Sequence, residues 1–104
     1  MFVVSLGMGG LAWAGEAEDA FKEGARLLSA AKLREAVPYF DKAIELNPKN
    51  ARAYGDRGIA QLLLWKDTEA QKDFAKCFEL DQGMRKVFEL LIEKANAKHA
   101  GKPP

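Results

Sequence analysis

The chain has 104 residues, of which 16 are basic and 15 acidic, so its formal net charge is +1. With 48% hydrophobic and 30% charged residues, it has the composition of one small globular domain, and global disorder is not expected. This balance of charge gives no reason to expect a nucleic acid or an anionic membrane surface as a partner. The single cysteine, Cys77, has no second cysteine to pair with and belongs to no zinc or thiol motif.

Residues 1–15 carry no charged side chain and are rich in apolar residues and glycine. The segment is shorter than the roughly 20 apolar residues that cross a bilayer, so no stable membrane span is predicted. It has the length of the apolar region of a signal peptide, and Ala12-Trp13-Ala14 fits the small residues before a cleavage site, although no basic residue precedes Lys22. A truncated signal peptide would place the protein in the periplasm or outside the cell.

In the alternative interpretation the protein is cytoplasmic, and residues 1–15 form an apolar arm that packs on the helices that follow. Gly7, Gly9 and Gly10 argue against a long helix in this arm, because each glycine disfavours a helix by about 1 kcal/mol relative to alanine.

Helical spacing of apolar residues begins at Glu16. These residues recur every three or four positions as far as Leu28, which predicts a first helix. A second helix is expected to begin between residues 33 and 35 and to end at Asn47, because the residue before Pro48 is pushed out of the α region. The two helices are expected to form an antiparallel pair.

The same pattern returns in the second half of the chain. Two further helices are expected on either side of a turn at Lys66-Asp67, followed by a fifth helix from Gly83 to Lys98. Residues 99–104, which include His99, are expected to be a frayed and solvated tail. The fifth helix has an apolar stripe that would cover the open end of the second helix pair, formed by Met84, Val87, Phe88, Leu91, Ile92 and Ala95.

Residues 17–50 and 51–84 align with each other at a period of 34 residues. A fixed period of this length is typical of stacked helical units, none of which can bury its apolar face alone. Identical residues in the two segments include Gly24 and Gly58, Leu28 and Leu62, Lys32 and Lys66, Glu35 and Glu69, Ala36 and Ala70, Phe40 and Phe74, Lys42 and Lys76, Glu45 and Glu79, and Leu46 and Leu80.

These positions resemble the tetratricopeptide repeat family. Its pattern has an aromatic residue and then glycine in the first helix of each repeat, alanine, an aromatic residue and a small residue in the second, and proline at the end. The resemblance implies an all-α fold, an α-solenoid of antiparallel helix pairs with about five helices. The repeat domain would cover residues 16–98, with repeat 1 at 17–50, repeat 2 at 51–84 and a capping helix at 83–98.

The residues at these positions have expected packing roles. The glycine of each first helix lets the two helices of a repeat approach closely, and the phenylalanine of the second helix is expected to fill the larger space between repeats. The family's bulky residue is replaced by Ala20 in repeat 1, and its closing proline by Gln82 in repeat 2. The other residues assigned to this packing are Gly24, Ala36, Phe40, Ala43, Pro48, Tyr54, Gly58, Ala70, Phe74 and Cys77.

In this family the first helices of the repeats line a concave groove that typically holds an extended peptide or a partner helix. The resemblance therefore implies a protein or peptide partner. The Lys and Asn residues with which one subclass grips a C-terminal carboxylate are replaced here by Phe21, Ala25 and Asp56. The expected groove residues are Glu18, Phe21, Lys22, Ala25, Leu28, Ser29, Arg52, Gly55, Asp56, Ile59, Leu62 and Leu63.

Trp65 stands at a turn where the family commonly has glycine. Two interpretations of this residue stay open. It could be an exposed anchor for a partner, since tryptophan is enriched in binding hot spots. It could also pack locally on its own helix pair, as single apolar surface residues often do.

The sequence contains no glycine-rich phosphate loop, zinc spacing, nucleophile motif or paired carboxylates, so no enzyme, cofactor or metal site is predicted. An enzyme would need the groove charges to converge in one pocket. The predicted function is a protein-interaction module with a scaffold or assembly role. Two repeats and a cap are fewer than the roughly three repeats usual for stability, so a structural protein that self-associates through its repeat ends, as a homo-oligomer, is the alternative.

Overall fold

The computed structural model describes residues 2–99, with side chains from residue 15 onward. Five helices account for nearly all of this range, and no strand is found within it. The all-α fold expected from the sequence is thereby confirmed. The helices are α1 (Phe2–Ser29), α2 (Leu33–Leu46), α3 (Ala51–Leu63), α4 (Asp67–Leu80) and α5 (Met84–His99).

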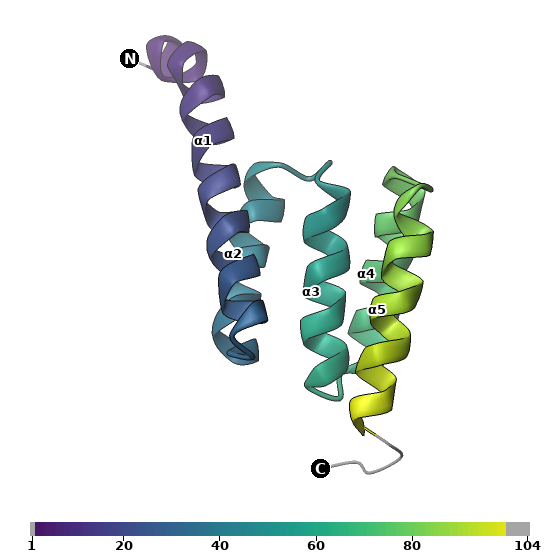
Figure 1. Cartoon of the computed structure of the whole chain (residues 1–104). Coiled ribbons are helices and arrows are strands. Elements are labelled where there is room, and N and C mark those ends of the chain that lie inside the picture. Colours follow the sequence, from purple (N-terminus) through teal and green to yellow (C-terminus); the bar gives the residue numbers. More distant parts are fainter. Residues whose placement is uncertain (1, 100–104) are drawn as a thin grey trace.

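The helices form two layers of an α-solenoid. Helices α1, α3 and α5 lie in one layer, and α2 and α4 lie behind them in the other (Figure 1). The closest packing is within the pairs α1–α2 and α3–α4, and the two pairs meet mainly through α2 and α3. Each 34-residue repeat is therefore one antiparallel helix pair.

Helix α1 is longer than the sequence indicated, because it begins at Phe2 and passes through Gly7, Gly9 and Gly10. The expectation that these glycines prevent a long helix was wrong. Once a helix is formed, each added residue gains a hydrogen bond without a new nucleation step, which can offset the low helix propensity of glycine. The cleavage motif Ala12-Trp13-Ala14 lies outside the residues whose side chains are described.

Within each repeat, a phenylalanine ring fills the space left by a glycine. A β-carbon on Gly24 would lie 2.8 Å from the ring of Phe40, and one on Gly58 would lie 2.6 Å from the ring of Phe74. Phe40 packs with Leu27 and other residues of its own repeat. The interpretation that Phe40 fills the space between repeats was therefore wrong, because the glycine opens a nearer site inside the pair.

Small residues make the contact between the two repeats. Ala20 of α1, Ala43 of α2 and Ala53 of α3 form one buried cluster. Beside it, a hollow on the outer surface of repeat 1 is lined by Ala20, Tyr39 and charged residues. Tyr39 is 42% exposed.

Arg57 of α3 joins the two repeats electrostatically. Its Nη1 donates to Oδ1 of Asp41 in repeat 1 at 2.8 Å, and its Nε and Nη2 donate to the carboxylate of Asp73 in repeat 2, both at 2.8 Å. The hydrogen bonds to Asp73 and then to Asp41 raise the pKa of Arg57, against the opposing effect of burial. Asp73 is only 5% exposed, so this carboxylate depends on Arg57 for its compensation.

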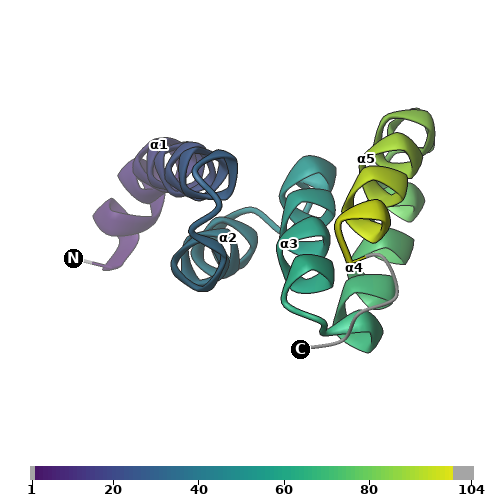
Figure 2. The same cartoon turned by 60° about the horizontal axis from the view of Figure 1, so that its bottom comes forward.

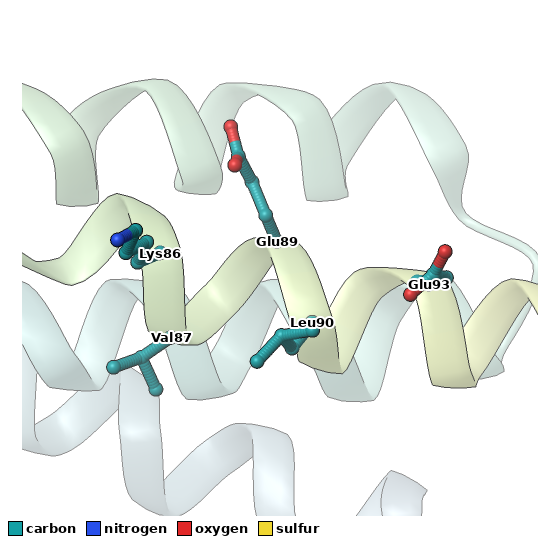
Figure 3. Close-up of a pocket in the computed structure, with 5 residues that line it drawn as sticks. All are labelled: Lys86, Val87, Glu89, Leu90 and Glu93. Carbon is teal, nitrogen blue, oxygen red and sulfur yellow. The ribbon is translucent and has the colours of Figure 1, made fainter.

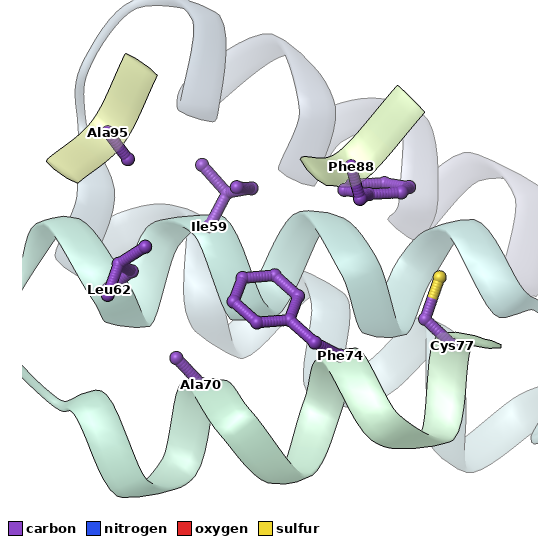
Figure 4. Close-up of a cluster of buried hydrophobic side chains, with 7 residues drawn as sticks. All are labelled: Ile59, Leu62, Ala70, Phe74, Cys77, Phe88 and Ala95. Carbon is purple, nitrogen blue, oxygen red and sulfur yellow. The ribbon is translucent and has the colours of Figure 1, made fainter. Parts of the chain in front are cut away.

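Helix α5 packs mainly against α3 and less against α4. Its Phe88 and Ala95 are buried and project toward Ile59 and Leu62 of α3, and Phe74 and Cys77 of α4 complete the cluster with Ala70 (Figure 4). The ring of Phe88 lies where a β-carbon on Gly55 would be. The largest apolar core of the described residues is thus closed by α5.

Candidate functional site

The layer that contains α1, α3 and α5 forms the face on which the sequence places a groove, and α3 lies between the other two helices (Figure 2). At the N-terminal end of α3 there is a hollow lined by residues of α1 and of the α2–α3 and α4–α5 connections. Its lining residues are Glu18, Phe21, Asn47, Lys49, Asn50, Ala51, Arg52, Leu80, Asp81 and Met84.

Three residues expected in the groove come together in this hollow: Glu18 and Phe21 from repeat 1 and Arg52 from repeat 2. The ring of Phe21 also packs against the ring of Phe40, with centroids 6.1 Å apart, and this contact helps to fix its position. Further along α1, Lys22 and Ser29 are exposed and Ala25 is half-buried. The lining of the hollow is mainly polar, with a few apolar side chains and charges of both signs.

The rest of the expected groove in repeat 2 is not open. Gly55, Asp56, Ile59 and Leu62 are all buried, and α5 covers this face of α3 through Phe88. Leu28 and Leu63 are half-buried and pack against the same cluster. The expectation that this face of α3 lines an open groove was therefore wrong for its central residues, because the fifth helix occupies the space.

Asp56 is an expected groove residue with a strongly altered pKa. It is 7% exposed, and burial raises its pKa to about 6, while the positive charge of Arg52 acts in the opposite direction. The closest atoms of the two side chains, Nε of Arg52 and Oδ2 of Asp56, are 4.0 Å apart. This carboxylate lacks the close contact with a cation that Asp73 has.

Cys77 lies in the same core as Phe88. Burial, followed by the negative charge of Asp56, raises the pKa of the Cys77 thiol to about 11. The thiol is therefore protonated at neutral pH, and it occupies a place where a small apolar residue is needed.

The outer side of α5 carries exposed apolar side chains. Val87 is 45% exposed and Leu90 is 61% exposed, and they lie beside Lys86, Glu89 and Glu93 around a shallow hollow. Figure 3 shows that Val87 and Leu90 project from one side of α5 and Glu89 from the other. The assignment of Val87 to the buried stripe was wrong, and the sequence analysis missed Leu90, which belongs to the same helical spacing.

Trp65 and His99 contact each other. Their rings are stacked with centroids 3.5 Å apart and planes at 10°, and Nε2 of His99 lies 3.3 Å from the carbonyl oxygen of Leu63. The expectation that His99 belongs to a solvated tail was wrong, since this residue ends α5 and is half-buried. Of the two interpretations of Trp65, the geometry favours local packing, because its ring holds the C-terminal end of α5.

Among the described residues, no helix is long and apolar enough to cross a membrane. No group of three or more His, Cys, Asp or Glu side chains among them could hold a metal ion.

Comparison with known proteins agrees with the repeat architecture. Family models described as tetratricopeptide repeat match residues 27–50 and 39–79, together about half of the chain. The Hsp70-Hsp90 organizing protein of Triticum aestivum is 34% identical over 72 residues, which make up 69% of this chain and 12% of that protein. No solved structure matches the chain.

Two other relatives match part of the chain. DnaJ homolog subfamily C member 7 of Homo sapiens is 35% identical over 66 residues, 64% of this chain and 13% of that protein. The UDP-N-acetylglucosamine--peptide N-acetylglucosaminyltransferase of Giardia intestinalis is 40% identical over 55 residues, 53% of this chain and 4% of that protein. The chain thus spans only a small part of each relative's length.

Proposed function

The chain belongs to the tetratricopeptide repeat family and is a protein–protein interaction module, and on this premise we propose that it binds a peptide or helix of a partner on the face formed by α1, α3 and α5. The binding region would be the open part of that face, from the hollow at the N-terminal end of α3 along the exposed side of α1. A scaffold or assembly role follows from this mode of binding.

The observation that carries the proposal is the hollow itself, because residues from both repeats and from the start of α5 line it. Its lining combines the apolar side chains of Phe21, Leu80 and Met84 with polar ones, and Glu18 and Arg52 supply opposite charges. A segment with an apolar anchor and flanking charges of both signs fits this chemistry better than a strongly charged ligand.

The names of some relatives contain Hsp70 and Hsp90, but the groove of this chain supports a different kind of ligand. Three positions would need Lys or Asn to hold a C-terminal carboxylate. The first is occupied by Phe21, which packs on an aromatic ring, and the second by Asp56, which is a buried acid. The third, Ala25, is apolar. We therefore propose anchoring by apolar contacts and not by a terminal carboxylate.

The test is photo-crosslinking in the native host. A photoreactive phenylalanine derivative replaces Lys22 or Arg52, which are exposed on the proposed face, and in matched controls it replaces Lys42 of α2 or Lys72 of α4, which are exposed on the other layer. We expect adducts with the same partner at the first two positions and none at the controls. Equal adducts at all four positions would contradict the proposal.

We also propose that the chain is not an enzyme. Of the four groove charges, Arg52 and Glu18 line the hollow, whereas Asp56 is buried and Lys22 is not part of that lining. The similarity to the Giardia transferase covers 4% of that protein, too little to transfer its activity.

Export remains a separate proposal. It is supported by the apolar, uncharged sequence of residues 1–14 and by the small residues at Ala12 and Ala14. The mass of the N-terminal peptide isolated from cells tests it. A peptide that begins at Gly15 supports cleavage, and an intact N-terminus argues for the cytoplasmic alternative.

A further inference from the structure

The two connections between successive helix pairs have the same geometry but a different sequence. At the α4–α5 connection the amide of Gly83 donates to Oδ1 of Asp81 at 2.9 Å, and at the α2–α3 connection the amide of Lys49 donates to Oδ1 of Asn47 at 3.2 Å. Asp81 (φ −153°, ψ 99°) and Asn47 (φ −144°, ψ 87°) also share a similar backbone conformation.

Only one of the two connections contains a residue that forbids a helix. Pro48 follows Asn47, and a proline excludes the residue before it from the α region. Gln82 takes the equivalent place after Asp81, and it is a good helix former. Helix α2 must therefore end, whereas α4 ends only because the Asp81 turn and the packing of α5 favour a break.

Apart from the first amides of α5, which donate to the carbonyl oxygens of Asp81 and Gln82, the contacts that hold α5 are made by its side chains on a neighbouring surface. Phe88 fills the space at Gly55, and Ala95 lies in the same cluster as Leu62. At the C-terminal end of α5, His99 stacks on Trp65. An identical helix from another molecule could make every one of these contacts.

We propose that residues Asp81–Gly83 form a hinge through which α5 exchanges between two copies of the chain. In the exchanged dimer, α4 and α5 of each copy form one continuous helix, and each α5 docks on α3 of the other copy. Exchange of an identical element preserves the contacts of the monomer, so little free energy opposes it. The occupant of the α3 face is then the second copy's α5.

The exposed residues of α5 add a reason for the dimer to form. Val87 and Leu90 lie shortly after the hinge and are 45% and 61% exposed in the monomer. Exchange brings the two hinges of a dimer next to each other. These apolar side chains then have a new surface against which to be buried.

The hinge can be tested by two substitutions in the full chain. Gly83→Ala favours a continuous helix, and in the bent form its β-carbon would lie 3.1 Å from Oδ1 of Asp81. Gln82→Pro copies Pro48 and blocks the continuous helix. It suits the present bend, because Asp81 already has an extended backbone and no hydrogen bond from the amide of Gln82 is found among the described residues.

The oligomeric state is measured by light scattering from micromolar to millimolar concentration. We expect the unchanged chain to dimerise as its concentration rises, and Gly83→Ala to increase the dimerisation constant by about tenfold or more, since two hinges contribute. Gln82→Pro should give a monomer with the helix content and melting temperature of the unchanged chain. A Gly83→Ala chain that stays monomeric throughout, or a dimer that persists in Gln82→Pro, would overturn the proposal.

Crosslinking identifies which α5 lies on which α3. Lys66→Cys and Lys98→Cys introduce exposed thiols next to the stacked pair Trp65 and His99, in a Cys77→Ala background that removes the native thiol. A short bismaleimide should join two chains in the isolated dimer and join the two positions of one chain in the isolated monomer. Crosslinks within one chain in the dimer would show an ordinary end-to-end contact and would refute exchange.

Discussion

The ring of Phe88 in α5 occupies the space that a β-carbon on Gly55 in α3 would need. Gly55→Ala must therefore displace Phe88 or shift α5, and we expect it to destabilise the fold by about 1–3 kcal/mol. Gly15→Ala is the matched control, because no atom lies within 4 Å of the β-carbon it adds. Urea unfolding of both variants checks the prediction, and an equal effect of the two substitutions would contradict it.

The second prediction concerns two non-glycine residues with left-handed backbone. Ala31 (φ 62°) and Trp65 (φ 66°) take equivalent places after α1 and α3. At each place an amide hydrogen bond closes the helix: the amide of Ala31 donates to the carbonyl oxygen of Leu28, and the amide of Trp65 donates to that of Leu62. Ala31→Gly is expected to stabilise the protein by about 1 kcal/mol, because glycine adopts this conformation without steric strain.

Trp65→Gly relieves the same strain but removes the stack on His99. The difference between the two glycine variants therefore measures what the stack contributes to the free energy of unfolding. We expect Trp65→Gly to be less stable than Ala31→Gly by about 1 kcal/mol or more. Equal melting temperatures of the two variants would show that the stack does not hold α5.

The third prediction concerns the link between the repeats. Arg57→Ala leaves the buried carboxylate of Asp73 without its partner, so we expect a loss of about 3–5 kcal/mol in the free energy of unfolding. Arg26→Ala breaks an exposed pair with Glu23 and should leave stability nearly unchanged. Chemical denaturation compares them, and a small effect of Arg57→Ala would mean that the side-chain amide of Gln61 or water compensates Asp73.

The fourth prediction is a dependence of stability on pH. The pKa of Asp56 is about 6 in the folded protein, whereas the ordinary value of 3.8 applies to the unfolded chain, so the folded protein binds the proton more tightly. The contribution of Asp56 is therefore unfavourable above pH 6 and disappears as the pH falls through the range between these two values. Asp56→Asn should stabilise the protein by about 2–3 kcal/mol at a pH of about 8.

Unfolding at several pH values tests this prediction. The advantage of Asp56→Asn over the unchanged chain should shrink steadily toward a pH of about 4, where the Asp56 carboxyl is protonated in the folded protein and about half protonated in the unfolded chain. The same substitution at the exposed Asp41 is not a neutral control, because Asp41 bonds to Arg57. Asp67→Asn is a better control, because Asp67 is exposed at the start of α4.

Much of the fold was predictable because the repeat constrains local structure. Residues of equal type 34 positions apart implied two equivalent helix pairs, and Pro48 marked the end of α2. The open part of the candidate site was predictable for the same reason, since Glu18, Phe21 and Arg52 follow from their repeat positions. The start of α1 was not, because glycine propensity is a weak local preference.

The sequence by itself determined the helix pairs and their stacking, because the spacing of apolar and small residues repeats in both halves. Only the tertiary structure decided how α5 sits. Phe88 and Val87 are neighbours in one apolar stripe, and the rotation of α5 that buries Phe88 and exposes Val87 depends on the space at Gly55. The stack of Trp65 on His99 joins residues from different helix ends, a contact that no local pattern contains. The docking of α5 on α3 covers the repeat 2 part of the expected groove and leaves the hollow beside repeat 1 open.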